Sequence, residues 1–465
     1  MSFNTDRELD IIVYGATSYV GKLVCEHLKN NYLNKYDVTS KESIKIGMGG
    51  RSKEKLEKVK DELGLPIDLP IFVVDSFDVN GLENMCKVTK AVITLVGPYA
   101  KFGDGLIKAC AEKGTHYFDL TGETLWVSNQ ITNLNIKSKL SKSIIVPSCG
   151  FDSVPSDLNT MIASQTLKKL VGKDVGVGRV TSGVDARGGV SGGTLLSLLG
   201  TFDDGFKAFS KAMESYVLSP IKGIQKDTGD WIIREPSIVG GLFVMAPHNG
   251  AIVRYSWGLL ESNNQIIPQE LKYGPEFTYD EFMITPTTIL AFILTLTLKV
   301  LIILLFIPQI RQLIKILGPK SGGGPSEKER ESGWFKMITT AHSVNDDVHV
   351  RVTMKGNKDP GYGFTSVCIA ECAITVIKSF DDLPPLAKFG GVLTPVTALG
   401  EALRRRLESN QIIKIETEII KDKRSRKKLF YVDDQVNEKV SLYPDENFKV
   451  VTSKLSNKLE SDQML

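Results

Sequence analysis

A short apolar run that ends at a glycine and is followed by a helical pattern constrains this chain more than any other stretch. The run is Leu9–Tyr14, the glycine is Gly15, and apolar residues recur at helical spacing through Tyr19–Leu28. This order predicts a strand, a tight turn and a helix, which together aim backbone N–H groups and the positive helix end at one point. The stretch therefore predicts a site for an anionic group; the alternative is an ordinary strand–helix turn.

The residues of this turn have the sizes that close contact with a pyrophosphate requires. Gly15 would permit the sharp turn, and Gly21 would let the helix pack close to the strand. Ser18 stands where a G-x-x-G-x-x-G loop has its middle glycine, but its small side chain still allows close approach and could donate a hydroxyl. The predicted phosphate-binding residues are Gly15, Ala16, Thr17, Ser18, Tyr19, Val20 and Gly21.

The end of the next predicted strand, within 43–50, carries Arg51 and Ser52. In a Rossmann unit this strand end meets the adenosine ribose, where an acidic residue favours NAD and an arginine accommodates the 2′-phosphate of NADP. No acidic residue stands there, and Lys55 follows one turn along the predicted helix. The pattern predicts NADP, with Arg51 and Ser52 as cofactor-binding residues; the alternative is a solvated arginine at a loop.

Strands and helices continue to alternate along the first 150 residues. Further strands are predicted at 71–75, 91–96, 116–120 and 143–147, with helices at 52–63, 81–86 and 105–113. Short, almost wholly apolar strands separated by helices are typical of a parallel sheet covered on both faces. The predicted fold class is α/β: an N-terminal Rossmann domain, a doubly wound parallel sheet, over residues 1–150.

A second, α+β domain is expected over residues 151–417, followed by a charged tail over 418–465. We expect this domain to serve substrate binding and dimerisation, with strands at 175–180, 251–257, 348–354 and 366–377. The run 188–194 is rich in glycine and precedes a helical pattern, so it predicts either an anion or substrate site or a flexible turn.

Three loops follow predicted strands and should meet at the carboxyl edge of the first sheet, where ligands of open α/β sheets bind. Gly97 would let the backbone pass the cofactor, Pro98 would stiffen that loop, and Tyr99 could donate a proton or pack on the sheet edge. Asp152 and Ser153 are candidate catalytic groups or a helix N-cap. Glu123 is expected to favour the N-terminus of the helix that follows it.

The segment 287–307 is apolar apart from Lys299 and is bounded by Pro286 and Pro308. Its length suffices to cross a bilayer core, for which about 20 residues are needed. A span would separate the first domain from the later strands, so we expect a segment that dips into or lies along one leaflet, with Lys299 reaching the headgroups. The alternative is a buried helix pair at an oligomer interface. A flexible linker is expected at 320–332, and the basic run 421–428 could touch anionic lipid.

Composition excludes some classes of function. The net charge of +3 gives no reason to expect nucleic acid, and the first residues lack the pattern of a secretory signal. The 6 cysteines and 5 histidines are scattered without metal-ligand spacing, so we expect reduced thiols and no metal.

The ordered set of motifs resembles the saccharopine dehydrogenase-like oxidoreductase family, which is similar to the bacterial trans-acting enoyl reductases. The motifs lie at 15–21, 50–52, 96–99, 119–123, 150–157, 188–194 and 390–395. The resemblance runs from residue 9 to residue 415 and departs from the family pattern at Ser18.

This resemblance implies an NAD(P)-dependent oxidoreductase, with NADP favoured, acting on a hydrophobic or lipid substrate at a membrane or lipid-droplet surface. It also implies a membrane-associated location on the cytosolic face, and a homodimer is possible. The alternative function is a catalytically inactive lipid-surface adaptor that retains the Rossmann fold, because Ser18 and the lack of a secure catalytic acid both allow it.

Overall fold

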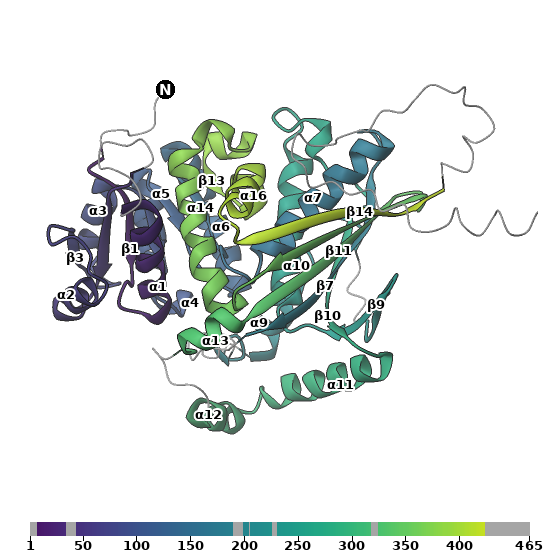
Figure 1. The fold of residues 1–465 in the computed structure, drawn as a ribbon, viewed down its shortest axis with the longest axis horizontal. Helices are drawn as coiled ribbons and strands as arrows, with labels where there is room; N and C mark the ends of the chain where they lie inside the picture. Colours follow the sequence, from purple (N-terminus) through teal and green to yellow (C-terminus); the bar gives the residue numbers. More distant parts are fainter. Residues whose placement is uncertain are drawn as a thin grey trace, which may run out of the picture.

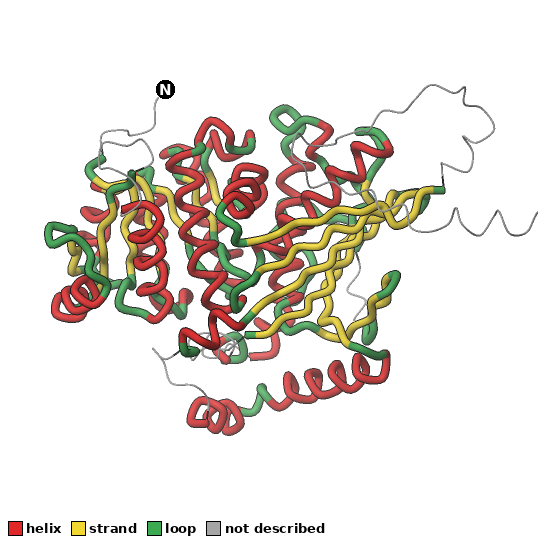
Figure 2. The backbone as a smooth tube through the Cα atoms, viewed as in Figure 1, coloured by secondary structure: helices red, strands yellow, loops and turns green. Residues whose placement is uncertain are grey.

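Two seven-stranded sheets form the framework of the molecule (Figures 1 and 2). The structure is a computed structural model that describes residues 7–33, 43–188, 199–203, 205–225, 230–317 and 324–423. The first sheet and its helices stand at the left of Figure 1, and the longer strands of the second sheet fan out at the right. One hydrophobic core runs through both parts.

The first sheet is the predicted doubly wound parallel sheet. Its strand order is β13-β6-β5-β4-β1-β2-β3, and all its neighbouring strands pair in parallel. Its strands are β1 (Leu9–Tyr14), β2 (Ile46–Gly50), β3 (Ile71–Val73), β4 (Thr89–Thr94), β5 (His116–Phe118), β6 (Ile144–Val146) and β13 (Gly391–Val392). The strands within the first 150 residues are those expected, because buried parallel strands read as short apolar runs.

Helices cover both faces of this sheet. They are α1 (Tyr19–Leu28), α2 (Lys53–Glu62), α3 (Val79–Val88), α4 (Tyr99–Phe102), α5 (Asp104–Lys113), α6 (Thr124–Ser141), α14 (Thr365–Lys378) and α16 (Gly400–Ser409). Helix α14 packs on α1 and β4. The prediction of a strand at 366–377 was therefore wrong: this segment is apolar on every side because it is buried on every side, and such a run does not distinguish strand from helix.

The second sheet is mixed, in the order β14-β12-β11-β7-β10-β9-β8. Its strands are β7 (Val177–Arg187), β8 (Ile233–Glu235), β9 (Ile238–Leu242), β10 (Thr278–Thr285), β11 (Trp334–Ser343), β12 (Val348–Gly356) and β14 (Ile413–Asp422). The strand predicted at 348–354 is confirmed as β12. The predicted tail boundary at 417/418 falls inside β14, and residues 424–465 lie outside the described residues.

The helices of the second part are α7 (Val154–Val171), α9 (Gly205–Ala212), α10 (Ala246–Ser262), α11 (Thr288–Leu304), α12 (Pro308–Leu317), α13 (Glu327–Ser332) and α15 (Pro395–Ala398). Shorter π- and 3₁₀-helical turns are η1 (Lys29–Leu33), η2 (Gln269–Leu271), η3 (Pro360–Phe364), η4 (Phe380–Asp382) and η5 (Pro385–Phe389). The strand predicted at 251–257 is wrong, because these residues lie in α10, which is buried along most of its length. The predicted linker 320–332 contains α13, which a capping box of Ser326 and Glu329 begins.

The apolar segment 287–307 contains α11, and α12 follows it; the two helices lie along the lower side of the molecule in Figure 1. The two helices are bent by 110° relative to each other. The strands before and after them, β10 and β11, both pair with β7, so the chain enters and leaves this segment on the same side. One other helical stretch, Pro360–Lys378, is long and apolar enough to span a membrane, but 89% of it is buried inside the protein.

Candidate cofactor and active site

The turn after β1 has the geometry predicted for a phosphate-binding turn. Gly15 has a φ of 87°, a backbone conformation that favours glycine. A Cβ on Gly21 would lie 2.3 Å from the Gly15 carbonyl oxygen, so only glycine lets α1 start this close to the strand. Ser18 caps α1, because its Oγ accepts from the Gly21 N–H at 3.0 Å.

The side chain of Tyr19 is occupied by a later part of the chain. Its hydroxyl donates to the Pro325 carbonyl and accepts from Arg330 Nη1 at 2.6 Å, and its ring meets Tyr362 edge-on at 5.1 Å between centroids. Tyr19 therefore offers a ligand its backbone N–H, one of the first-turn groups that no helix bond satisfies. The same contacts hold the chain just after 318–323 against the start of α1.

Arg51 stands exposed at the end of β2, where the adenosine end of a dinucleotide would lie. Among the described residues, no hydrogen bond or ion pair engages its guanidinium. Its charge acts on the nearby Tyr14 hydroxyl, which donates to the Val74 carbonyl at 3.1 Å and whose pKa is raised, chiefly by burial. Ser52 uses its Oγ to cap α2, accepting from the Lys55 N–H at 3.4 Å.

Tyr99 is a packing residue in this structure. It is buried, its hydroxyl donates to the Thr94 carbonyl at 3.1 Å, and the same hydroxyl oxygen accepts from the Leu120 N–H at 3.1 Å. Burial, with a smaller contribution from the Asp119 carboxylate, raises the pKa of this phenol well above its usual value. Tyr99 thus connects the loop after β4 to the loop after β5. The remaining candidate proton donors lie in the Asp152 loop.

Glu123 acts at a helix N-terminus, but not the one expected. Its carboxylate accepts from the backbone N–H groups of Tyr99 at 2.8 Å and Ala100 at 2.7 Å, so it caps α4. It makes no side-chain cap on α6, which follows it in sequence. Glu123 therefore fixes the loop that contains Gly97 and Pro98.

The loop after β6 holds the strained backbone of the site. Ser148 and Ser153 have φ values of 63° and 135°, and a non-glycine residue in such a conformation costs about 1–3 kcal/mol that the surrounding structure must offset. Ser153 stands at the N-cap position of α7 without capping it; its Oγ donates to Asn249 Oδ1 at 3.3 Å. The N-cap interpretation of this serine is corrected.

Asp152, between these two serines, has the properties of a general acid or base. Burial raises the pKa of its carboxyl to about 6, and among the described residues no hydrogen bond or ion pair holds it. The Asp119 side chain supports the loop from below, because its Oδ1 accepts from the N–H groups of Thr121 and Ser148, both at 2.9 Å. A carboxyl with a pKa near neutrality on a strained loop is typical of a catalytic position.

Three further polar residues of the second part reach this edge, and the sequence did not single them out. His248 bridges Thr124 Oγ1 at 2.9 Å and Ser148 Oγ at 3.0 Å, and burial lowers its pKa to about 4. The Asn249 amide donates to Glu281 Oε1 at 2.9 Å, and burial raises the pKa of Glu281 to about 7. The available signal was the polar break Pro247–Gly250 ahead of an apolar run.

The residues of the first sheet fit a phosphorylated dinucleotide. The close Gly15–Gly21 contact brings the N-terminus of α1 to the end of β1, where a diphosphate would bind, and the exposed Arg51 guanidinium suits a 2′-phosphate. The loops at Gly97 and Asp152 follow β4 and β6 at the same edge. Of the glycine-rich run 188–194, all but Gly188 lies outside the described residues.

All six cysteines are free and buried. Comparisons with known proteins show which family this site and fold are similar to. The saccharopine dehydrogenase NADP binding domain family matches residues 11–145.

Curated relatives match nearly the whole chain. A putative trans-acting enoyl reductase of Mycobacterium tuberculosis is 33% identical over 431 residues, covering 87% of this chain and 96% of the relative. The trans-acting enoyl reductase of Mycobacterium bovis is 32% identical over 435 residues, covering 88% and 97%. Among solved structures, apo saccharopine dehydrogenase from Saccharomyces cerevisiae has a TM-score of 0.50 at 11% identity, covering 89% of this chain and 100% of that one, which shows a shared fold.

Proposed function

Because the chain belongs to the saccharopine dehydrogenase-like family of NADP-binding oxidoreductases, together with the trans-acting enoyl reductases, we propose that it reduces a hydrophobic enoyl substrate at a lipid surface. The relatives are named for reduction of an enoyl group, and the proposal takes the same class of acceptor. The observation that carries the redox part is that the Gly15–Gly21 turn, Arg51 and the Asp152 loop follow strands of one parallel sheet.

The side chains of this site divide the work of an NADPH-dependent reduction. The first turn of α1 would hold the diphosphate, and Arg51 and Ser52 would face the adenosine end. NADPH held by these residues would supply the hydride for one carbon of the double bond. Asp152, with a pKa of about 6, would give the proton that the other carbon takes up, so that C=C becomes CH–CH.

The buried groups around Asp152 would exclude water from the site and leave Asp152 as its proton donor. His248 stays neutral because its pKa is lowered, and both its ring nitrogens are held by hydroxyls. Ser153, Asn249 and Glu281 form a connected chain of hydrogen bonds beside the Asp152 loop. This chain orients the loop that would carry the proton donor.

The exposed apolar helices support the lipid-surface part of the proposal. Helix α11 buries Ala291 and Thr295 against β9 and leaves most of its large apolar side chains exposed. The exposed large hydrophobic residues of α11, α12 and the bend between them are Ile289, Leu290, Phe292, Ile293, Leu296, Val300, Leu301, Ile303, Leu304, Ile307, Leu313, Ile316 and Leu317. A continuous apolar surface of this kind suits burial in one leaflet, and the chain returns to the same sheet on both sides.

Two charged side chains of the segment and of α12 contact other parts of the protein. Lys299 Nζ lies 4.0 Å above the ring of Trp231, and the reach of this amine to the headgroups stays a prediction. Arg311 bonds to Asp203 at 3.1 Å, and the aromatic contacts of Phe306 with Phe202 and Phe209 anchor the bend. These contacts give two cations of the helix pair partners within the protein, which lowers the cost of placing the pair at a lipid surface.

Cofactor binding is tested by titrating the fluorescence of NADPH and NADH against the purified chain. Arg51→Glu should lower NADPH affinity at least tenfold and leave NADH affinity within twofold, because only NADPH carries the 2′-phosphate. Lys58→Glu, on the exposed side of α2, is the matched charge control. Absence of binding of either dinucleotide at millimolar concentration would leave the adaptor as the function.

Lipid attachment is tested by liposome flotation and by carbonate extraction of membranes. Ile303→Lys should move the protein out of the floating fraction, because a lysine costs about 2.5–3.5 kcal/mol at the bilayer centre and less near the interface. Ile67→Lys, which changes an isoleucine that is 92% exposed far from α11, is the control. Release of the wild-type chain by carbonate would defeat insertion.

A further inference from the structure

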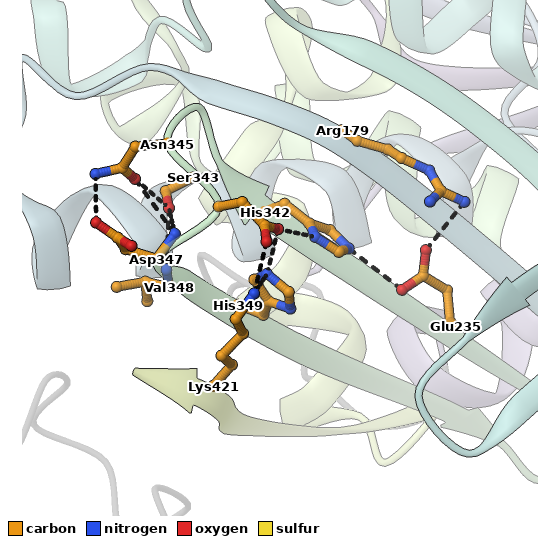
Figure 3. A network of polar contacts seen from close by, with 10 residues as sticks. Arg179, Glu235, His342, Ser343, Asn345, Asp347, Val348, His349 and Lys421 are labelled. Carbon is orange, nitrogen blue, oxygen red and sulfur yellow. Dashed lines mark hydrogen bonds and ion pairs between the residues drawn. The ribbon is translucent and has the colours of Figure 1, made fainter. Parts of the chain in front are cut away.

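The tip of the β11–β12 hairpin gathers two histidines and a carboxylate. His342 and His349 are cross-strand partners, and their ring centroids lie 3.9 Å apart. Asp346, in the turn between them, places Oδ1 at 3.2 Å from His342 Nδ1 and at 2.6 Å from His349 Nε2. Figure 3 shows the two histidine rings meeting at this end of the second sheet.

We propose that His342, Asp346 and His349 form a binding site for a divalent transition-metal ion, with Zn²⁺ as the expected ion. Two imidazoles and a carboxylate are a donor set that zinc takes in proteins, with water in the fourth position. One ligand atom from each residue lies within 4.8 Å of the others. Tetrahedral zinc with bonds of about 2.0–2.1 Å holds its ligand atoms about 3.3 Å apart, so small side-chain rotations suffice.

A supporting carboxylate fixes which nitrogen of His342 faces the site. Glu235 Oε2 lies 3.2 Å from His342 Nε2, and Arg179 holds the same carboxylate at 3.2 Å. A proton on Nε2, donated to Glu235, leaves the lone pair of Nδ1 directed at Asp346. This carboxylate–histidine arrangement is the usual outer support of a metal-ligating histidine.

The turn itself is held in place independently of any ion. Ser343 Oγ accepts from the N–H groups of Asp347 at 3.1 Å and Val348 at 3.0 Å, and it donates to Asn345 Oδ1 at 2.8 Å. Asp346 has a φ of 56°, a conformation that aspartate and asparagine tolerate better than most residues. The ligands are therefore preorganised.

A cation of the chain already touches two of the three proposed ligands. Lys421 Nζ lies 2.6 Å from Asp346 Oδ2 and 3.1 Å from His349 Nε2, from its place opposite His349 on β14. The pocket thus attracts positive charge, and a metal ion must displace this ammonium. The side chain of Lys421 is 29% exposed near the end of the described chain, so it can turn into solvent.

The experiment uses the full chain without a histidine tag, after removal of metal with EDTA. Zn²⁺ is titrated by calorimetry, and Co²⁺ reports the coordination geometry through its visible absorption. The wild type should bind one ion per chain with micromolar affinity, and His342→Ala and His349→Ala should each weaken binding at least tenfold. The cysteines are buried and should not compete.

Two pairs of variants separate ligation from a change of fold. Lys421→Met should strengthen binding severalfold, a gain that unfolding cannot produce. Asp346→Asn should weaken it, whereas Asp347→Asn, one residue along the same turn, should bind as the wild type does. Lack of saturable uptake by both the wild type and Lys421→Met would overturn the proposal, and so would full affinity in the two histidine variants.

Discussion

Replacing Gly21 by alanine tests the cofactor turn most directly, because helix propensity predicts a higher unfolding free energy and close packing predicts a lower one. Alanine normally stabilises a helix interior relative to glycine by about 0.8–1.0 kcal/mol. Here the new Cβ would lie 2.3 Å from the Gly15 carbonyl oxygen and 2.8 Å from Ala16 Cα. Both are backbone atoms, which cannot rotate away as a side chain can, so α1 must move by about 1 Å to restore an ordinary contact.

The contact should outweigh the helix propensity. Overpacking of this kind costs about 1–3 kcal/mol, so after the gain in helix propensity Gly21→Ala should lose up to about 2 kcal/mol of unfolding free energy overall. The same movement displaces the N–H groups of the first turn, and NADPH affinity should fall at least tenfold.

The assay combines urea unfolding with NADPH fluorescence titration. Gly200→Ala is the control, because a Cβ there would meet nothing within 4 Å. If Gly21→Ala were as stable as the wild type or more so and bound NADPH with unchanged affinity, the proposed cradle would be refuted.

Three further predictions follow from buried polar groups. Asp152→Asn should lower kcat by about 10²–10⁴ and leave the Kd for NADPH unchanged. Since the pKa of Asp152 in the free protein is about 6 and the acid form donates, wild-type kcat/KM should fall as pH rises through 6, and the variant should lack this decrease. The pKa of His248 is about 4 in the folded protein, so only the unfolded chain takes up its proton between pH 6.5 and 4. The free energy of unfolding should therefore fall by up to about 3 kcal/mol over this pH range. Urea unfolding of His248→Gln should lack this decrease. Thr295→Val should lose about 1–3 kcal/mol by leaving the Leu242 N–H unpaired, measured as a lower Tm.

The Rossmann sheet was predictable because its signals are local. A strand of buried apolar residues, a glycine that must adopt a positive φ and the helix spacing after it all stand within Leu9–Leu28. The NADP prediction rests on local signals too, and the NADP binding domain family that matches residues 11–145 confirms this cofactor, while the role of Arg51 stays a prediction. Helices α10 and α14 were misread because residues buried on every side lose the alternation that separates strand from helix.

The proposed metal ligands at the hairpin tip and the polar groups around Asp152 were not predictable from local sequence signals. His342 and His349 become neighbours only because β11 and β12 pair in one register. His248 meets Ser148 across 100 residues of sequence. No spacing rule along the chain brings such pairs together.

The sequence by itself determined the strand–turn–helix, the cofactor class and the apolar surface segment, because backbone conformation and hydrophobic periodicity depend on nearby residues. The tertiary structure decided that Tyr99 packs, that Glu123 caps α4, that Lys299 covers Trp231 and that the Asp152 carboxyl has no hydrogen bond or ion pair with the residues that the structure describes. The physical reason is that hydrogen-bond partners and burial are set by packing between distant segments, and these two quantities fix the protonation and reach of a side chain.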